Sequence, residues 1–332
     1  MNLRLARSRS MKKPELPIPT LPKVVAKIEQ GDCLNVLRRH PANRFDLIIT
    51  SPPYADQRKN TYGGHAPVAY VEWFTKRSAE FLRVLKPTGT FILNIKEKVQ
   101  AGERHTYVVD LILALRKQGW LWTEEFIWHK KNCHPGKWPN RFRDAWERCL
   151  QFNKSREFHM YQEAVMVPMG DWAKTRLRKL GKNDVIRFDS KVGSGFGKNI
   201  ANWVGREMAY PSNVLHFATE TGNKSHSATF PKALPIWFIK LFTKEGDWVL
   251  DPFVGSGTTS LAAQELGRNS IGIDKLKEYV VMARSLTGTA ETRNGTNPKR
   301  RDRQIRGRAH GVLPQRQNKK SHRAKTAKNP KA

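Results

Sequence analysis

The chain has 332 residues, with 60 Lys and Arg side chains against 29 Asp and Glu and a net charge of +31, so one large or two modest domains are expected. This surplus indicates a polyanionic partner and argues against an enzyme of small neutral metabolites. Hydrophobic residues make up 39% of the chain, which excludes disorder throughout. Three cysteines cannot make a disulfide framework, and no apolar run reaches the roughly 18 residues of a membrane span. We therefore expect a cytoplasmic protein with no membrane partner.

The positive charge is concentrated at the two ends. Residues 293–332 hold 14 Lys and Arg side chains and one Asp, with almost no large apolar residues. Such a composition cannot offset the entropy of ordering, so 291–332 is predicted to be a disordered basic tail. It is either a phosphate-binding arm or a solvated tail without a specific role. Residues 1–24 are predicted to be a basic N-terminal arm.

In chain order, the first part of the sequence alternates short apolar runs with amphipathic stretches. Residues 27–32 are predicted to form a short strand that runs into a Gly turn, and further strands are predicted at 45–50, 90–95 and 122–128. The predicted helices cover 34–37, 71–85 and 108–117. A second alternating block begins near residue 230. Its predicted elements are a helix at 234–242, a strand at 247–251, a helix at 258–266, a strand at 270–274 and a helix at 279–286. The alternation predicts a parallel sheet covered on both faces.

Residues 131–228 lack this rhythm and are rich in Lys, Arg, Gly, Asn and Trp. We interpret them as a basic insert between two halves of one α/β domain, at 25–130 and 229–290. Basic side chains there would contact phosphates, which position a protein on DNA without specifying sequence.

A glycine-rich loop follows the strand predicted at 247–251. It reads Asp251-Pro-Phe-Val-Gly-Ser-Gly-Thr-Thr259, and its glycines allow a close approach to a ligand and a sharp turn into the next helix. Asp274 ends the following strand, where an acid accepts hydrogen bonds from ribose hydroxyls. No Lys follows the second Gly, so the loop favours a nucleoside without a phosphate chain. The segment 193–199 superficially matches a phosphate-binding loop, but the required Gly and Ser/Thr are missing.

A proline-rich loop, Ser51-Pro52-Pro53-Tyr54, follows the strand predicted at 45–50. Ligands of open α/β sheets bind at the carboxyl ends of strands, so chemistry is expected here. The prolines make the loop rigid and can hold the Pro52 carbonyl as an acceptor. Ser51 adds a hydroxyl acceptor and Tyr54 a ring for stacking a base, worth ~1–3 kcal/mol. Two acceptors beside a stacking ring suit a planar group with an exocyclic NH₂.

Together the two loops resemble the motifs of β-group DNA amino-methyltransferases, which methylate cytosine N4 or adenine N6 with S-adenosylmethionine. The resemblance covers about residues 26–288, with the catalytic motif first and the cofactor motif after the insert. It implies a Rossmann-like α/β methyltransferase sheet, mixed and mostly parallel, with circularly permuted motif order and a target-recognition insert at 131–228. Ser at the first catalytic position is typical of cytosine-N4 enzymes of restriction–modification systems. The implied partners are double-stranded DNA and a cognate restriction endonuclease, in a prokaryotic or phage-like, nucleoid-associated setting.

The resemblance also assigns site residues. Ser51, Pro52, Pro53 and Tyr54 match the catalytic motif, and Asp32 matches an acid that contacts the adenine amino group of the cofactor. The predicted cofactor-binding residues are Asp32, Phe230, Pro231, Asp251, Phe253, Gly255, Ser256, Gly257, Thr258 and Asp274.

The sequence leaves several functions open. The base could be adenine N6, the substrate could be RNA, or the chain could be a non-catalytic DNA-binding protein on the same scaffold. No metal is expected, because the spacing of His129, Cys133, His134 and Cys149 matches no standard zinc site. No cysteine has the Pro-Cys context of a cytosine-C5 nucleophile, so direct attack by the base nitrogen is predicted.

Overall fold

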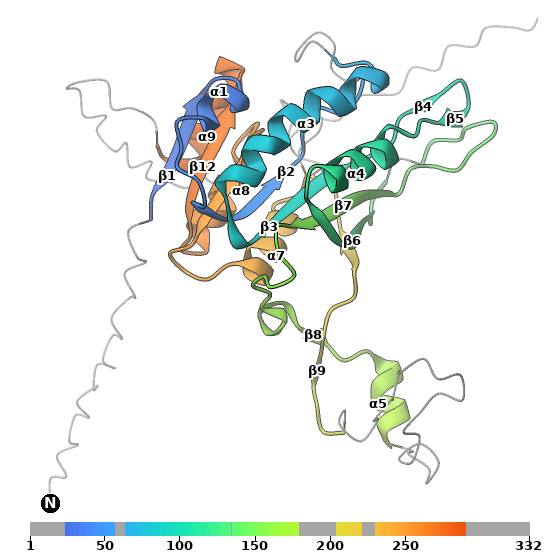
Figure 1. The fold of residues 1–332 in the computed structure, drawn as a ribbon. Helices are drawn as coiled ribbons and strands as arrows, with labels where there is room; N and C mark the ends of the chain where they lie inside the picture. Colours follow the sequence, from blue (N-terminus) through green and yellow to red (C-terminus); the bar gives the residue numbers. More distant parts are fainter. Residues whose placement is uncertain (1–23, 57–63, 134, 179–203, 221–229, 290–332) are drawn as a thin grey trace, which may run out of the picture. The chain divides into compact units, whose positions relative to one another are not determined.

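The computed structural model describes residues 24–56, 64–133, 135–178, 204–220 and 230–289 (Figure 1). The predicted basic tail, the 193–199 loop and all but the last residue of the predicted N-terminal arm lie outside this part. Among the described helices, none is long and apolar enough to cross a membrane.

The described core contains one eight-stranded sheet with the order β1-β12-β11-β2-β3-β7-β6-β10. The strands are β1 Ala26–Gln30, β2 Phe45–Thr50, β3 Leu85–Ile95, β6 Leu121–Lys130, β7 Trp146–Asn153, β10 Val214–Phe217, β11 Trp248–Asp251 and β12 Asn269–Asp274. Neighbouring strands are parallel except at β7, which is antiparallel to both β3 and β6. The mixed, mostly parallel sheet is as predicted. Because β11 and β12 lie between β1 and β2, the two motif-bearing loops come from adjacent strands.

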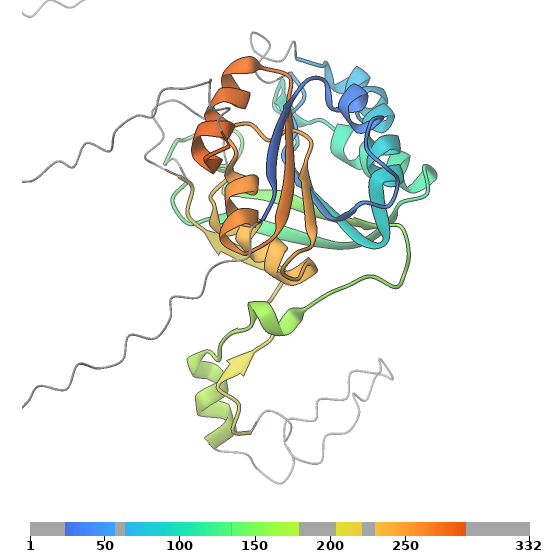
Figure 2. The same ribbon diagram turned by 90° about the vertical axis from the view of Figure 1, so that its left-hand side faces the viewer.

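Helices cover both faces of the sheet, as the alternation predicted (Figure 2). Blue and cyan helices on one face are α1 Cys33–Leu37, α3 Pro67–Val84 and α4 Tyr107–Lys117. Orange helices on the other face are α7 Ala233–Phe242, α8 Thr258–Glu265 and α9 Lys277–Thr287. On β2, Ile48 packs into the core beneath the first group, while Leu47 and Ile49 pack beneath the second. A strand buried on both faces therefore has a continuous apolar run.

Two predicted boundaries around α3, the helix predicted at 71–85, were wrong. The helix begins at Pro67 rather than 71, because Pro is favoured in the first turn, and it ends at Val84. Leu85 is already extended and pairs with Phe45, so β3 starts five residues before the predicted strand. Gly89 is required within β3, since a Cβ there would lie 2.9 Å from the carbonyl oxygen of Asp46.

The segment 131–228, expected outside the sheet, contributes β7 and β10 to it. The sequence signal of β7 was hidden because Glu147 and Arg148 interrupt its apolar residues, and ion pairs with Lys130 and Glu97 compensate those charges. Its other described elements are η1 Gln162–Val165, β8 Val167–Pro168, α5 Asp171–Arg178 and β9 Met208–Ala209, with β8 and β9 paired as a separate ribbon. Target recognition by this segment stays a prediction.

Candidate active site

The proline-rich loop lies at the carboxyl end of β2, where it was expected. The Ser51 hydroxyl donates to the Tyr54 hydroxyl at 3.2 Å, and the Tyr54 hydroxyl donates to Glu147 Oε2 at 2.8 Å. Asn94 Oδ1 on β3 lies 3.2 Å from the same hydroxyl. A phenol has one proton to donate, so the shorter bond to the carboxylate takes it. Burial, with Glu147 second, holds the pKa of Tyr54 well above its usual value, so the phenol stays protonated.

Glu147 is a site residue that the sequence reasoning missed. It lies on β7 with its side chain buried, and Lys130 on the neighbouring β6 donates to its Oε1 at 2.6 Å. Its two oxygens therefore join the catalytic loop after β2 to a lysine on β6, three strands away in the sheet. A charged residue next to another in a basic segment gives no signal that distinguishes it from a surface residue.

Asp251, at the end of β11, connects the two loops. One carboxylate oxygen accepts from the Thr50 hydroxyl at 2.6 Å and from the Phe253 amide at 3.1 Å, and the other accepts from the Thr259 hydroxyl at 2.6 Å. Burial raises the pKa of this carboxyl to about 6, against the lowering effect of those bonds. Its described contacts are internal, so Asp251 shapes the glycine-rich loop from beneath.

The glycine-rich loop turns into α8 through two glycines in the left-handed region. Gly255 has φ 53° and its amide donates to Asp274 Oδ2 at 3.1 Å. Gly257 has φ 97°, and a Cβ there would lie 2.9 Å from the Cα of Ala283 on α9. The other oxygen of Asp274 accepts from the Leu276 amide at 2.9 Å. Asp274 therefore holds together the loop and the strand end that the sequence placed side by side. The remaining predicted residues of this loop, Ser256 and Thr258, lie at the start of α8 with their hydroxyl oxygens 3.5 Å apart.

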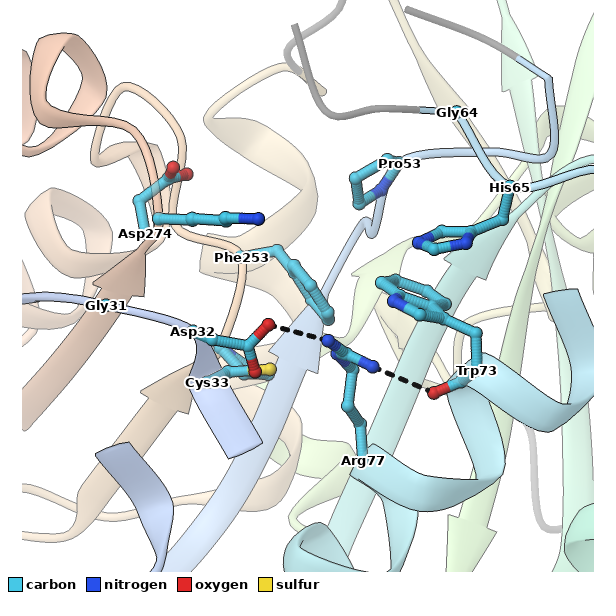
Figure 3. A pocket seen from close by; sticks show the side chains of 12 residues that line it. Gly31, Asp32, Cys33, Pro53, Gly64, His65, Trp73, Arg77, Phe253 and Asp274 are labelled. Atoms are coloured by element: carbon cyan, nitrogen blue, oxygen red, sulfur yellow. Dashed lines mark hydrogen bonds and ion pairs between the residues drawn. The ribbon is translucent and has the colours of Figure 1, made fainter. Parts of the chain in front are cut away.

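A pocket opens between the two loops (Figure 3). Four predicted residues line it: Asp32, Pro53, Phe253 and Asp274. Phe230 and Pro231, which precede α7, do not line it; Phe230 packs against the core beneath α7 and Pro231 is buried. Their contact with the cofactor stays a prediction.

The wall of the pocket opposite Asp274 is built from aromatic rings, of which Trp73 and His65 were not predicted. Trp73 on α3 stacks on His65, with ring centroids 4.5 Å apart, and lies 5.7 Å from the ring of Phe253. Burial, Arg77 and Lys275 lower the pKa of His65, so its ring is neutral near pH 7. Flat rings of this kind suit a nucleobase. A Trp on an amphipathic helix is indistinguishable in sequence from a core residue.

Arg77 lies in the same pocket, one helical turn after Trp73. Its Nη2 donates to Asp32 Oδ2 at 2.6 Å, and its guanidinium lies 4.3 Å from the Trp73 ring centroid (Figure 3). The other oxygen of Asp32 accepts from the Leu34 amide at 3.0 Å and caps α1. Cys33 also lines the pocket, but burial raises the pKa of its thiol to about 12, so it is not a nucleophile.

The residues weighed as zinc ligands are partly dispersed. His129 Nδ1 lies 3.0 Å from His216 Nδ1 across β6 and β10, whereas Cys149 is buried in the core. Within the described part of the chain, no three His, Cys, Asp or Glu side chains are grouped to hold a metal ion. His134 lies outside that part.

Comparison with known proteins agrees with this geometry. Residues 45–285 match a family model described as DNA methylase, for N6 and N4 methyltransferases. The chain is 30% identical over 274 residues to the type II methyltransferase M.PvuII of Proteus hauseri, covering 75% of this chain and 80% of the relative. It is 25% identical over 292 residues to M.SmaI of Serratia marcescens, covering 78% and 89%.

Solved structures show the same fold. The PvuII DNA methyltransferase, named as cytosine-N4-specific, superposes with a TM-score of 0.60 at 25% identity, covering 81% of this chain and 90% of that one. A DNA modification methylase of Thermus thermophilus, described as putative and solved with S-adenosyl-L-methionine, superposes with a TM-score of 0.53 at 23% identity, covering 80% and 94%. The predicted methyltransferase fold is confirmed.

Proposed function

Because the chain belongs to the N6/N4 DNA methylase family of type II methyltransferases, we propose that it methylates the exocyclic N4 of cytosine in duplex DNA. The methyl donor is S-adenosylmethionine, whose sulfonium supplies an activated methyl group. The observation that carries the proposal is Ser51 at the carboxyl end of β2, within hydrogen-bond distance of Tyr54. The likeness to M.PvuII, whose structure is named as cytosine-N4-specific, supports the choice of base.

The pocket residues fit that donor. The aromatic rings of Trp73 and Phe253 provide apolar faces for the adenine, and Asp32 accepts from its amino group. Asp274 accepts from the ribose hydroxyls, since its carboxylate lines the pocket at the end of β12. The open space above Gly255, where an added Cβ would meet nothing within 4 Å, leaves room for the methionine part.

The catalytic loop then acts on a base that has left the duplex, which costs a few kcal/mol. The ring of Tyr54 stacks on the base while its hydroxyl stays bonded to Glu147. The Ser51 hydroxyl and the Pro52 carbonyl accept hydrogen bonds from the two N–H groups of the base's amino group. These bonds turn the lone pair of the amino nitrogen toward the methyl group. Attack is direct, and catalysis is mostly positional and electrostatic. We further propose that the protein is the modification arm of a restriction–modification system with a cognate endonuclease.

The deciding experiment incubates the protein with S-adenosylmethionine and unmethylated duplex DNA and identifies the methylated nucleoside by mass spectrometry. N4-methylcytosine is the expected product. N6-methyladenine would overturn the base while retaining the mechanism, and cofactor binding without any DNA product would point to RNA. Absence of both cofactor binding and product would leave a non-catalytic DNA-binding protein.

Two variants test the roles within the loop. Ser51→Ala and Tyr54→Ala are expected to lose methylation while DNA binding, measured by fluorescence anisotropy, largely survives. Equal loss of binding and turnover would contradict the roles assigned to these side chains.

A further inference from the structure

The segment 131–145, which joins β6 to β7, carries an aromatic side chain in solvent. Phe142 is 93% exposed, the largest exposed fraction among the large hydrophobic side chains of the described residues. It stands between Arg141 and Arg143, and Arg143 is exposed as well. Covering such a ring with a partner removes apolar surface from water and is therefore favourable.

The backbone that carries Phe142 is fixed to the rest of the protein. Asp144, two residues later, pairs with Lys96 at 3.0 Å, with Arg141 at 3.2 Å and with Arg104 at 3.6 Å. Lys96 follows directly after β3, and Arg104 belongs to the short ribbon of β4 Val99–Gln100 and β5 Glu103–Arg104. These ion pairs anchor the segment that carries the Phe142 ring.

The segment also packs against the turn of that ribbon. A Cβ at Gly102 would lie 2.8 Å from Asn140 Nδ2, so the two segments are in close contact. Figure 1 shows the connection between β6 and β7 running beside β4 and β5.

Phe142 lies close to the catalytic loop. Glu147, whose carboxylate accepts from Tyr54, is five residues further along the chain. A fully extended chain spans at most ~3.6 Å per residue, so the Cα atoms of Phe142 and Glu147 are within about 18 Å. A span of about 18 Å corresponds to roughly five base-pair steps of ~3.4 Å, so Phe142 is placed to meet the same stretch of duplex as the catalytic loop.

The surroundings of Phe142 are basic and aromatic. Residues 130–145 contain five Lys and Arg side chains and one Asp. Trp138 is 41% exposed, and the Arg141 guanidinium lies 5.4 Å from its ring centroid. Apolar side chains among cations are the means by which proteins separate base steps, with the cations on adjacent phosphates.

We propose that Phe142 is a wedge that enters the duplex at the position vacated by the target base, while Arg143 contacts the flanking phosphate. This inference rests on the proposed function, since only an enzyme that extrudes a base leaves a gap to fill. The ring stacks on the base pairs on either side of the gap and so lowers the free energy of the flipped state. Phe142 is a positioning residue, because it does not touch the reacting atoms.

The test compares two duplexes that carry the modified sequence, mapped beforehand from DNA methylated by the wild-type protein. In one the target base is paired, and in the other it faces an abasic site, where extrusion needs little work. Single-turnover methylation by Phe142→Ala is expected to be about 10- to 100-fold slower than wild type on the paired duplex, equivalent to ~1.4–2.8 kcal/mol. On the abasic duplex the two rates should agree within about threefold. Phe142→Leu keeps an apolar wedge and should retain most of the activity.

Leu113→Ala on α4 is the matched control, because Leu113 is also an exposed apolar residue, at 50%. Its rates should equal those of the wild type on both duplexes. A 2-aminopurine at the target position gives a readout independent of turnover. Its fluorescence should rise on binding the wild type and rise less with Phe142→Ala.

Three results would overturn the wedge. The first is an unchanged methylation rate for Phe142→Ala on the paired duplex, and the second is an equal loss of rate on both duplexes. The third is a dimer of the wild type that the variant loses without any change in methylation, which would assign the ring to self-association. Failure of the proposed function is distinguishable, since then the wild-type protein itself would methylate neither duplex.

Discussion

The Tyr54 hydroxyl donates a hydrogen bond of 2.8 Å to Glu147, a residue 93 positions later in the chain. The bond fixes one end of the ring that is proposed to stack on the target base, and the Lys130 ammonium fixes the carboxylate in turn. A ring held at its hydroxyl loses less freedom when a base stacks on its face. The sheet supplies the connection, because β7 brings Glu147 to the loop that follows β2.

Glu147→Ala is therefore expected to lower kcat by at least about tenfold, since a buried hydrogen bond to a charged group is worth about 1.5–3 kcal/mol. Glu147→Gln keeps an acceptor oxygen and should lose less. The dissociation constants for cofactor and DNA should stay within a few-fold of wild type. Steady-state methylation measures the first effect, and calorimetry and anisotropy measure the second. Glu72→Ala is the control, because Glu72 is exposed and pairs only with Lys76 among the interactions described on its helix. An unchanged kcat for Glu147→Ala would exclude a positioning role.

Gly257→Ala tests the close approach of the cofactor loop to α9. Both Gly257 and Gly246 have positive φ, of 97° and 84°, but only an added Cβ at Gly257 meets another element, at 2.9 Å from Ala283 Cα. Gly246→Ala should cost about 1–2 kcal/mol in the free energy of unfolding, from the backbone alone. Gly257→Ala should cost a further 1–3 kcal/mol or so from overpacking. Urea unfolding measures both, and equal midpoints for the two variants would refute the packing argument.

Asp274→Ala is expected to weaken cofactor binding by at least about tenfold, a loss of ~1.4 kcal/mol. The substitution removes the acceptor for the Gly255 and Leu276 amides as well as that proposed for the ribose. Titration calorimetry with S-adenosylmethionine gives the dissociation constant, and Asp274→Asn, which keeps one acceptor, should lie between. Asp110→Ala on the exposed face of α4 serves as the control. A variant that is folded by circular dichroism and binds normally would remove Asp274 from the cofactor site.

The buried carboxyl of Asp251 predicts a pH dependence of stability. Its folded-state pKa is raised to about 6 from 3.8, mainly by burial, so the protonated form is favoured on folding. The stabilising contribution is complete below pH 4 and is lost as the pH rises through about 6. The unfolding free energy of the wild type relative to Asp251→Asn should thus decrease between about pH 3 and pH 7, by up to about 3 kcal/mol in total. Thermal melts of both proteins across this range measure the difference, and a constant difference would contradict the shift.

Much of the fold could be predicted because its strands are buried on both faces. The run 45–50 forms β2 with the predicted bounds, and the strands and helices of the second block differ from prediction by no more than two residues at either end. β7 could not be predicted, because Glu147 and Arg148 are compensated only by partners distant in sequence. β7, the antiparallel strand of the described sheet, places Glu147 at the site, so the residue and its strand were missed together.

The site residues, like the strands, could be predicted only where a local sequence pattern marks them. Residues in loops at strand ends, such as Pro53 and Phe253, could be identified from their motifs and do line the pocket. Trp73 and Arg77 could not, because their spacing on α3 is that of any amphipathic helix, and only the packing of α3 over the sheet directs them to the pocket. Phe142 could not be identified either, because nothing in a sequence shows which aromatic residue of a loop is exposed to solvent.

The position of β12 between β1 and β11 has a consequence for the timing of synthesis. In the described sheet β1 pairs only with β12, so residues 26–30 emerge from the ribosome some 240 residues before their partner strand at 269–274. The bond from Thr50 to Asp251 likewise joins residues 201 positions apart. Contacts this distant in sequence form slowly. A nascent chain therefore has neither pocket nor joined loops until residues 248–275 have left the ribosome, and activity can begin only after that point.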